Sequence, residues 1–348
     1  MDRWLNSLEE TARQALAVPL FRYLSQGARD GTTASEAHAA WAEFRLLPHV
    51  LRDVTEIDTR TTVLGTELTC PVAVAPTTLQ RAVHPDGELA MARATAATGS
   101  LVVVSSNAGT PFADIGATGA DWWLQVYLSA DRTLSEPLLA SAVAAGAKAL
   151  VLTVDTPVVG TKYDGAGPTV WETTDPAILR VNAEPDLSEA PGAEKATDLG
   201  PHDIGWLAET TGLPVVVKGV LRPDDARRCV QAGAAGIWVS NHGGRQLDRS
   251  VSTAAALAPV AEAVGSEAEV YVDGGVRSGL DVVTALSLGA RAVFLGRLPL
   301  YALVGGESAV QRMLTDLQDE LVDALRLSGC RHLGDTRGLA VRGPLTGL

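Results

Sequence analysis

The sequence contains little of what several classes of protein require. Three cysteines occur among 348 residues, they lie far apart, and none forms a CxxC pair. This excludes a disulfide framework, argues against a zinc site, and is typical of proteins of a reducing cytoplasm. No run of about 18 apolar residues is present, as a transmembrane helix would require. We therefore expect no metal site, no membrane segment and a cytoplasmic location.

Positive charge is also scarce. Lys and Arg number 28 against 41 Asp and Glu, which gives a formal net charge of −13 at pH 7. A surface that binds nucleic acid needs clustered Lys and Arg, so nucleic acid is not expected as a partner. Any anionic ligand must find a local group of positive residues. Glu9 and Glu10 interrupt the N-terminal segment, which therefore does not resemble a signal peptide.

Most of the chain repeats one pattern from about residue 71 onward. Each repeat has a short apolar, β-branched run that ends in polar or glycine residues and leads into an alanine-rich stretch with helical spacing. Eight near-continuous apolar strands alternating with helices predict an α/β fold, a closed (β/α)8 TIM barrel. The absence of GxGxxG after the first strand disfavours a dinucleotide-binding fold. The expected strands are residues 72–76, 101–106, 122–128, 149–155, 214–219, 235–241, 269–275 and 292–297.

The chain, residues 1–348, is expected to form a single domain. Residues 1–70 are assigned to an N-terminal helical cap, 71–310 to the barrel, and 311–348 to a C-terminal helix and tail. The spacing of Ser7 and Glu10 is that of a capping box, which predicts a helix starting there. The interval between the fourth and fifth strands is about twice the others, so residues of about 160–200 are expected to form a long lid loop.

Polar residues follow nearly every expected strand. In a barrel of this kind the catalytic groups project from the carboxyl ends of the strands, so these residues are candidates for an active site. The candidates are Thr77, Thr78, Ser105, Gln125, Tyr127, Thr153, Asp155, Lys218, His242, Arg245, Asp273, Arg277, Gly296 and Arg297.

The most distinctive stretch is SNHGGRQLD, residues 240–248. It places His242 and Arg245 three positions apart on a glycine-rich turn. Histidine titrates near neutrality and serves as a general base, and guanidinium binds carboxylate through two parallel hydrogen bonds. The alternative is that both side chains only cap the loop.

Two later loops combine glycine with arginine. Arg277 follows Gly275 after the seventh strand, and Arg297 follows Gly296 after the eighth. Barrels often bind phosphate at these loops, which predicts a phosphorylated cofactor or substrate. The alternative is that both loops are simple tight turns. Lys218 at the end of the fifth strand needs an anionic partner, either a ring that gains negative charge on reduction or Asp155 or Asp273.

Several motifs together resemble one enzyme family. PVAVAPTTLQ, HPDGELAMARA, LQVYL, LTVDTP, VVVKGVLRPDDA, SNHGGRQLD, VDGGVRSG and FLGR follow one another between Tyr23 and Cys330. The sequence is similar to the FMN-dependent 2-hydroxy acid oxidases and dehydrogenases, which include glycolate oxidase, lactate oxidase, mandelate dehydrogenase and hydroxymandelate oxidase. The resemblance implies oxidation of an (S)-2-hydroxy acid to a 2-oxo acid, with FMN as cofactor and oxygen or another electron acceptor. It also implies a homo-oligomer, a tetramer or octamer.

The resemblance assigns roles to individual residues. His242 is implied as the catalytic base and Asp155 as the group that orients it, while Lys218 faces the flavin and stabilises its reduced form. Substrate binding is assigned to Tyr23, Tyr127 and Arg245. Contacts with the flavin ring or the ribityl phosphate are assigned to Thr77, Thr78, Ser105, Gln125, Thr153, Lys218, Asp273, Gly275, Arg277, Gly296 and Arg297.

Three positions depart from the family pattern and bear on the substrate. Lys162 stands where the family supplies a second active-site arginine, and it offers a point charge in place of the planar fork. Asn107 replaces an aromatic residue of the short-chain oxidases, which predicts a wider cavity and an aryl or bulky substrate such as mandelate or 4-hydroxymandelate. Thr78 replaces Ala or Gly beside the flavin. Trp171 in the lid is a candidate to cover an aryl group.

Other functions remain open at this point. One alternative keeps FMN but oxidises a larger biosynthetic metabolite or a modified peptide. A flavin-free, phosphate-binding lyase or isomerase would instead use Lys218 as a Schiff-base nucleophile. A non-catalytic barrel would be expected to lack His242, Asp155 and Lys218, all of which are present.

Overall fold

The computed structural model describes residues 3–163, 167–183, 187 and 189–343. At its centre is a closed barrel of eight parallel strands. Each strand pairs with the next along the chain, and β11 pairs with β4 to close the ring. The predicted (β/α)8 barrel is confirmed, and all eight expected strands belong to it. They are β4 (Val72–Val74), β5 (Leu101–Ser105), β6 (Asp121–Val126), β7 (Leu150–Thr153), β8 (Val215–Val220), β9 (Gly236–Val239), β10 (Glu269–Val272) and β11 (Ala292–Leu295).

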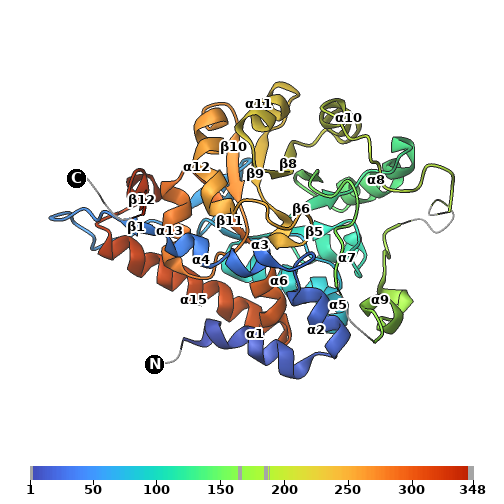
Figure 1. Cartoon of the computed structure of the whole chain (residues 1–348), viewed down its shortest axis with the longest axis horizontal. Coiled ribbons are helices and arrows are strands. Elements are labelled where there is room, and N and C mark those ends of the chain that lie inside the picture. The colour runs from blue at the N-terminus through green and yellow to red at the C-terminus, as the bar shows by residue number, and fades with distance from the viewer. Residues whose placement is uncertain (1–2, 164–166, 184–186, 188, 344–348) are drawn as a thin grey trace.

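Helices surround the barrel (Figure 1). The longest helix among the described residues is α15 (Gly306–Leu327), which packs against α6 (Gly87–Thr98) and α13 (Gly279–Ser287). The helices that follow the strands are α5 (Gln80–Val83), α6 (Gly87–Thr98), α7 (Phe112–Gly116), α8 (Glu136–Ala144), α10 (His202–Thr211), α11 (Pro223–Gln231), α12 (Thr253–Val264), α13 (Gly279–Ser287), α14 (Arg297–Leu303) and α15 (Gly306–Leu327).

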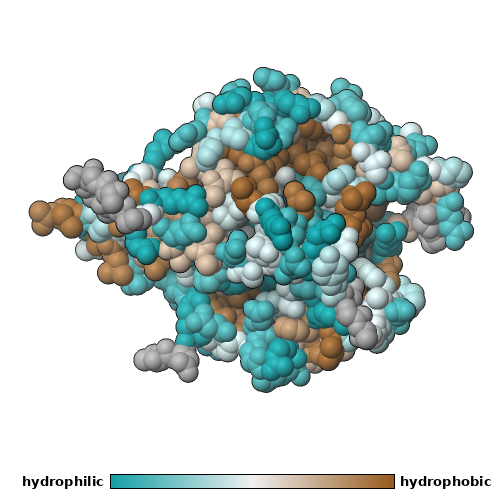
Figure 2. Space-filling view, in the orientation of Figure 1, coloured by the Kyte–Doolittle hydropathy of each residue, from teal (hydrophilic) through white to brown (hydrophobic). Residues whose placement is uncertain are grey.

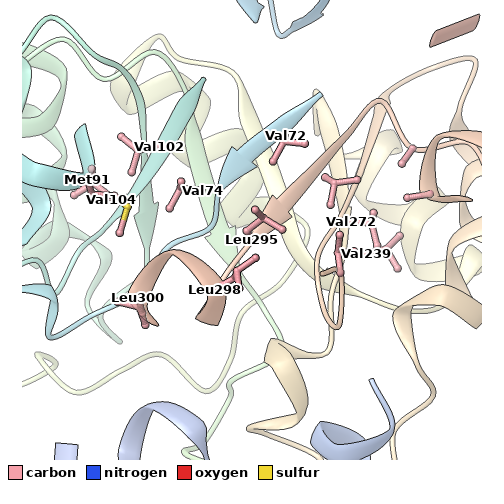
Figure 3. Close-up of a cluster of buried hydrophobic side chains, with 14 of the residues drawn as sticks. Val72, Val74, Met91, Val102, Val104, Val239, Val272, Leu295, Leu298 and Leu300 are labelled. Atoms are coloured by element: carbon pink, nitrogen blue, oxygen red, sulfur yellow. The ribbon is translucent and has the colours of Figure 1, made fainter. Parts of the chain in front are cut away.

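The layer between strands and helices is apolar. Figure 3 shows valines of β4 and β5 beside Met91 of α6, all of them buried. Burying a Val, Leu or Met side chain stabilises a fold by roughly 1.5–3 kcal/mol. This layer therefore provides much of the stability that holds the strand ends in place.

The interior of the barrel is filled by aromatic rings set against alanines. Trp123, Trp238, Tyr271 and Phe294 are fully buried there, and the rings of Trp238 and Phe294 lie 4.0 Å apart. Trp122, the neighbour of Trp123, belongs to the outer layer instead, because successive side chains of a strand point to opposite faces. Side chains thus fill the barrel at the amino ends of the strands, and a ligand can bind only at the carboxyl ends.

The N-terminal segment contributes four helices, as predicted, and they pack against the barrel helices and against the turn after β9. Two short sheets follow: a hairpin that contributes Val63 and Leu68 to the barrel interior, and a pair that joins residues 44–46 to residues 340–342. The elements are α1 (Trp4–Ala15), α2 (Val18–Ser25), α3 (Thr32–Glu36), α4 (Ala39–Ala42), β1 (Phe44–Leu46), β2 (Thr61–Val63), β3 (Thr66–Leu68) and β12 (Ala340–Arg342).

The predicted capping box at Ser7 is wrong. Helix α1 begins at Trp4, so Ser7 lies inside it, and its hydroxyl donates to the carbonyl of Trp4 at 2.7 Å. Glu10 is paired with Arg13 on the exposed face. Leu5 and Leu8 are buried and extend the amphipathic pattern toward the N-terminus, and that burial outweighs the local preference of a serine for the cap.

The segment between β7 and β8 forms the long lid predicted from sequence. Its described part contains helix α9 (Val170–Thr173) and a 3-10 turn, Pro176–Ile178, and it returns beside the loop after β6. Hydrophobic side chains also gather in a hollow between α10 and α11 (Figure 2), where a second cavity of about 320 Å³ lies. Within the described residues no helix is long and apolar enough to span a membrane, and the three cysteines are free thiols.

Candidate active site

A cavity of about 970 Å³ lies at the carboxyl ends of the barrel strands, lined also by residues of α2 and of the lid. The side chains predicted for the site converge on it, except Asp155, which lies against His242. The lining includes Tyr23, Thr77, Thr78, Ser105, Asn107, Gln125, Tyr127, Thr153, Lys162, Lys218, His242, Arg245, Asp273, Gly275, Arg277, Gly296 and Arg297.

His242 and Asp155 form the central pair of the cavity. His242 follows β9 in a 3-10 turn and has a left-handed backbone with φ of 58°, a conformation often found at functional sites. Its Nδ1 lies 2.9 Å from Oδ1 of Asp155, which also accepts from the Thr156 hydroxyl at 3.0 Å. Burial opposes ionisation of Asp155, but His242 and Lys218 outweigh it and hold the pKa of the carboxyl below its usual value. An ionised Asp155 makes Nδ1 the donor and leaves Nε2 to accept a proton.

Lys218 lies in a buried polar network below this pair. Its Nζ is 2.8 Å from Oδ2 of Asp273 and donates to the hydroxyl of Ser240 at 2.7 Å. That hydroxyl donates to the second oxygen of Asp273 and accepts from the backbone N–H of His242. Of the partners considered for Lys218 within the protein, the structure selects Asp273. The pair also fixes the start of the loop that carries His242.

Arg245 lies between the barrel and the N-terminal helices. Its guanidinium stacks 4.7 Å from the ring centroid of Tyr23 and donates to the carbonyls of Tyr23 and Gln26. Tyr127 also lines the cavity, and burial and the charge of Asp155 raise the pKa of its phenol. Tyr127 is therefore a protonated hydrogen-bond donor over the physiological range. Together these groups can bind a carboxylate beside His242.

The three positions that depart from the family pattern all lie at the cavity. The ammonium of Lys162 donates to the carbonyls of Gly160 and Arg245, at 2.8 and 2.6 Å. The hydroxyl of Thr78 donates to the backbone carbonyl of Asn107 at 3.1 Å. Lys162 and Thr78 are thus tied to nearby backbone.

A polar strip follows the ends of β5, β6 and β7. The hydroxyl of Ser105 donates to Oε1 of Gln125 at 3.2 Å. The amide nitrogen of Gln125 and the hydroxyl of Thr153 are buried and have no hydrogen-bond partner among the described residues. Buried polar atoms are nearly always satisfied, so this strip indicates a ligand with donors and acceptors along one edge.

Two arginines lie at the other end of the cavity. Arg277 donates to the carbonyl of Val276, and Arg297 donates to the carbonyls of Leu24 and Gln26. Neither guanidinium has a carboxylate within 4.0 Å in the part of the chain that the structure describes. Burial lowers the pKa of both, that of Arg297 to about 10. Two half-buried cations without a carboxylate within 4.0 Å among the described residues indicate a bound anion.

Glycines shape this end of the cavity. Gly275 has φ of 79°, and a Cβ there would come within 2.0 Å of the carbonyl of Ala37, so only glycine lets the loop after β10 pack on the N-terminal helices. A Cβ at Gly296 would meet nothing within 4 Å. It would project into open space beside Arg297, where backbone can approach a ligand closely.

A family model described as FMN-dependent dehydrogenase matches residues 12–342. The chain belongs to this family. It is 40% identical to glycolate oxidase 3 of Arabidopsis thaliana over 93% of this chain and 92% of that protein, and 38% identical to human 2-hydroxyacid oxidase 1 over 94% and 93%. A crystal structure of mandelate oxidase with (S)-4-hydroxymandelic acid superposes with a TM-score of 0.88 at 35% identity, covering 98% of this chain and 99% of that one.

The family member described here is therefore an FMN-dependent enzyme that oxidises 2-hydroxy acids. This excludes the flavin-free Schiff-base lyase and the non-catalytic barrel. The cavity fits FMN: Gln125 and Thr153 offer the unsatisfied polar atoms for the ring, and Arg277 and Arg297 the charge for a phosphate. When bound, FMN supplies the acceptor for the two electrons that the hydroxy acid loses.

Sequence reasoning missed three residues of the site. Ser240 links Lys218 to His242, and its signal was available because it opens the SNHGGRQLD motif. Thr156 steadies Asp155 and follows it directly in the chain. Lys195, from the end of the lid, lies over Tyr127. No sequence spacing connects Lys195 with Tyr127.

Proposed function

We propose that this enzyme oxidises an aryl or similarly bulky 2-hydroxy acid, such as mandelate or 4-hydroxymandelate, to the 2-oxo acid. His242 accepts the proton that the substrate loses, while Asp155 orients the imidazole and stabilises the imidazolium. Arg245, Tyr127 and Tyr23 hold the carboxylate, and Lys218 opposes the negative charge that arises on the cofactor side of the cavity.

The observation that carries this proposal is the His242–Asp155 pair beside Arg245 in a cavity with an apolar outer wall. Four leucines and one valine from the lid and from the segment after β6 line this wall, which suits a hydrocarbon side chain that glycolate lacks. The residues are Leu134, Leu138, Val159, Leu179 and Leu187.

Two further residues support a bulky substrate. Asn107 lines the cavity where an aromatic ring would narrow it. Trp171 of α9 lines the outer part and packs edge-on against Tyr23, with ring centroids 5.3 Å apart. A substrate ring placed between these residues would contact aromatic and aliphatic surface on several sides.

The test is anaerobic reduction of the FMN-loaded enzyme, followed as bleaching of the flavin band at roughly 450 nm. (S)-Mandelate and 4-hydroxymandelate are expected to bleach the flavin at lower concentration and faster than lactate or glycolate. Preferential bleaching by glycolate would overturn the aryl assignment. Bleaching only by a larger metabolite or a modified peptide would favour that alternative.

Reoxidation of the same reduced sample identifies the electron acceptor. We propose oxygen, so admitting air to the bleached enzyme should restore the yellow colour and release hydrogen peroxide. A flavin that stays reduced in air, and is reoxidised by a quinone or a dye, would identify a dehydrogenase. Thr78 lines the cavity, and a Thr78→Gly variant tests whether it limits access of oxygen.

A further inference from the structure

The last part of the lid is joined to the loop that follows β6. Ser129 and Lys195 form an antiparallel bridge, the N–H of Ala130 donates to the carbonyl of Glu194, and the N–H of Ala196 donates to the carbonyl of Leu128, both at 2.8 Å. Ala196 is completely buried. These hydrogen bonds fix the backbone of Lys195 independently of the conformation of the rest of the lid.

The side chain of Lys195 reaches from this bridge into the substrate part of the cavity. Its Nζ lies 4.0 Å from the ring centroid of Tyr127 and donates to the backbone carbonyl of Thr156. No carboxylate lies within 4.0 Å of it among the residues that the structure describes. Burial lowers the pKa of Lys195 to about 8, against the opposing effect of Asp155. The ammonium is thus partly desolvated and lacks an ion-pair partner, a state that favours binding of an anion.

Lys162 occupies a different position. Its ammonium donates to the carbonyls of Gly160 and Arg245, and the N–H of Gly160 donates to the side chain of Gln246. These contacts join the first part of the lid to the backbone of the loop that carries Arg245. These contacts indicate that Lys162 positions the loop that carries Arg245 and does not bind the substrate directly.

We propose that Lys195 is the second substrate-binding cation of this enzyme, opposite Arg245, and that Lys162 positions the Arg245 loop. The hydroxyl of Tyr127 is at the edge of the ring that the Lys195 ammonium covers, so one carboxylate oxygen can accept from both. Lys195 also contacts Tyr127 through a cation–π interaction, which holds the phenol in place before the substrate binds. This inference rests on the proposed placement of the carboxylate between Arg245 and Tyr127.

The experiment measures equilibrium binding rather than turnover. The FMN-loaded enzyme is titrated with benzoylformate and with its neutral amide, and the dissociation constants are read from the change in the flavin spectrum. The variants are Lys195→Met, Lys162→Met and Lys148→Met. Lys148 is a matched control, since it pairs with Asp121 at the opposite end of the strands, outside the cavity.

The comparison of the acid with the amide distinguishes the loss of a binding charge from a structural effect of the substitution. Lys195→Met should weaken benzoylformate binding about tenfold or more, and should change binding of the neutral amide less than threefold. Lys162→Met should weaken both ligands to a similar degree, and Lys148→Met neither. Equal losses for both ligands in Lys195→Met, or an anion-selective loss in Lys162→Met alone, would overturn the proposal.

The experiment tests the proposed substrate and the role of Lys195 independently. If the wild-type enzyme does not bind benzoylformate, the aryl proposal is wrong, and the same comparison is made with pyruvate and pyruvamide. A selective loss of pyruvate binding in Lys195→Met would then still support Lys195 as the second cation. Equal behaviour of the acid and the amide would contradict it.

Discussion

The two sides of the cavity are built differently. On the strand side, Lys218, Asp273 and Ser240 are buried in one hydrogen-bonded network that holds the His242 loop. On the lid side, leucines, valines and the half-exposed Trp171 form the wall, and the cations Lys162 and Lys195 bond backbone carbonyls. From this difference we propose that the barrel end provides the chemistry and the lid selects the substrate, since groups held by a buried network are positioned more accurately than groups on a long loop.

The largest effect is expected on the strand side. His242→Gln should lower kcat for the hydroxy acid by about 10²–10⁴-fold, because the proton acceptor is lost. Bound FMN and its spectrum should be retained. Stopped-flow reduction of the flavin measures the rate, and His202→Gln, an exposed histidine of α10, is the control. A His242→Gln variant with nearly normal reduction would mean that another group is the base.

The second effect concerns stability on the same side. Lys218→Met leaves the carboxylate of Asp273 buried without its cation, which should lower the free energy of unfolding by about 3–5 kcal/mol. Urea denaturation followed by circular dichroism measures it. Lys148→Met breaks an exposed ion pair with Asp121 and should cost less than about 1 kcal/mol. Similar losses in the two variants would remove the distinction between the buried network and the surface.

The third prediction concerns the substrate wall. Asn107→Trp should lower kcat/KM for mandelate by roughly 10–100-fold, because the indole occupies the space proposed for the substrate ring. Activity with glycolate should change less than threefold. Asn107→Ala keeps the space open and should retain mandelate oxidation. If Asn107→Trp leaves mandelate oxidation intact, the aryl group binds elsewhere in the cavity.

The smallest effect is a pH dependence on the lid side. Lys195 has a lowered pKa of about 8, so it is charged below that pH and loses its proton above it. Binding of benzoylformate should weaken about sevenfold between pH 7 and 9.5. Asp155 and Tyr127 face Lys195, and His242 and Arg245 lie near the same cavity. A Lys195→Met variant therefore isolates the contribution of Lys195 to the pH dependence.

In Lys195→Met this step should disappear, and in Lys195→Arg, which stays protonated, binding should be independent of pH over that range. Spectral titration of the FMN-loaded enzyme at each pH provides the measurement. A step that persists unchanged in Lys195→Met would assign the titration to another group.

Much of the fold could be predicted from local pattern. The eight strands alternate with helices at regular intervals, and this period of apolar runs specifies a barrel without reference to distant contacts. The positions of His242, Lys218, Arg277 and Arg297 at one end of the barrel followed from the same rule, since each lies near or shortly after the carboxyl end of a strand. The capping-box prediction at Ser7 was wrong, because burial of Leu5 extended helix α1 beyond the local signal.

The sequence by itself therefore determined the barrel, the family and the set of polar groups at the strand ends, because these depend on short-range periodicity and compact motifs. The tertiary structure alone decided which groups meet. It paired Lys218 with Asp273, directed Lys162 toward the backbone of Arg245, and brought Lys195 over Tyr127 from 68 residues away in the chain. Such contacts depend on where a long lid returns to the barrel, and no local preference of the residues specifies that path.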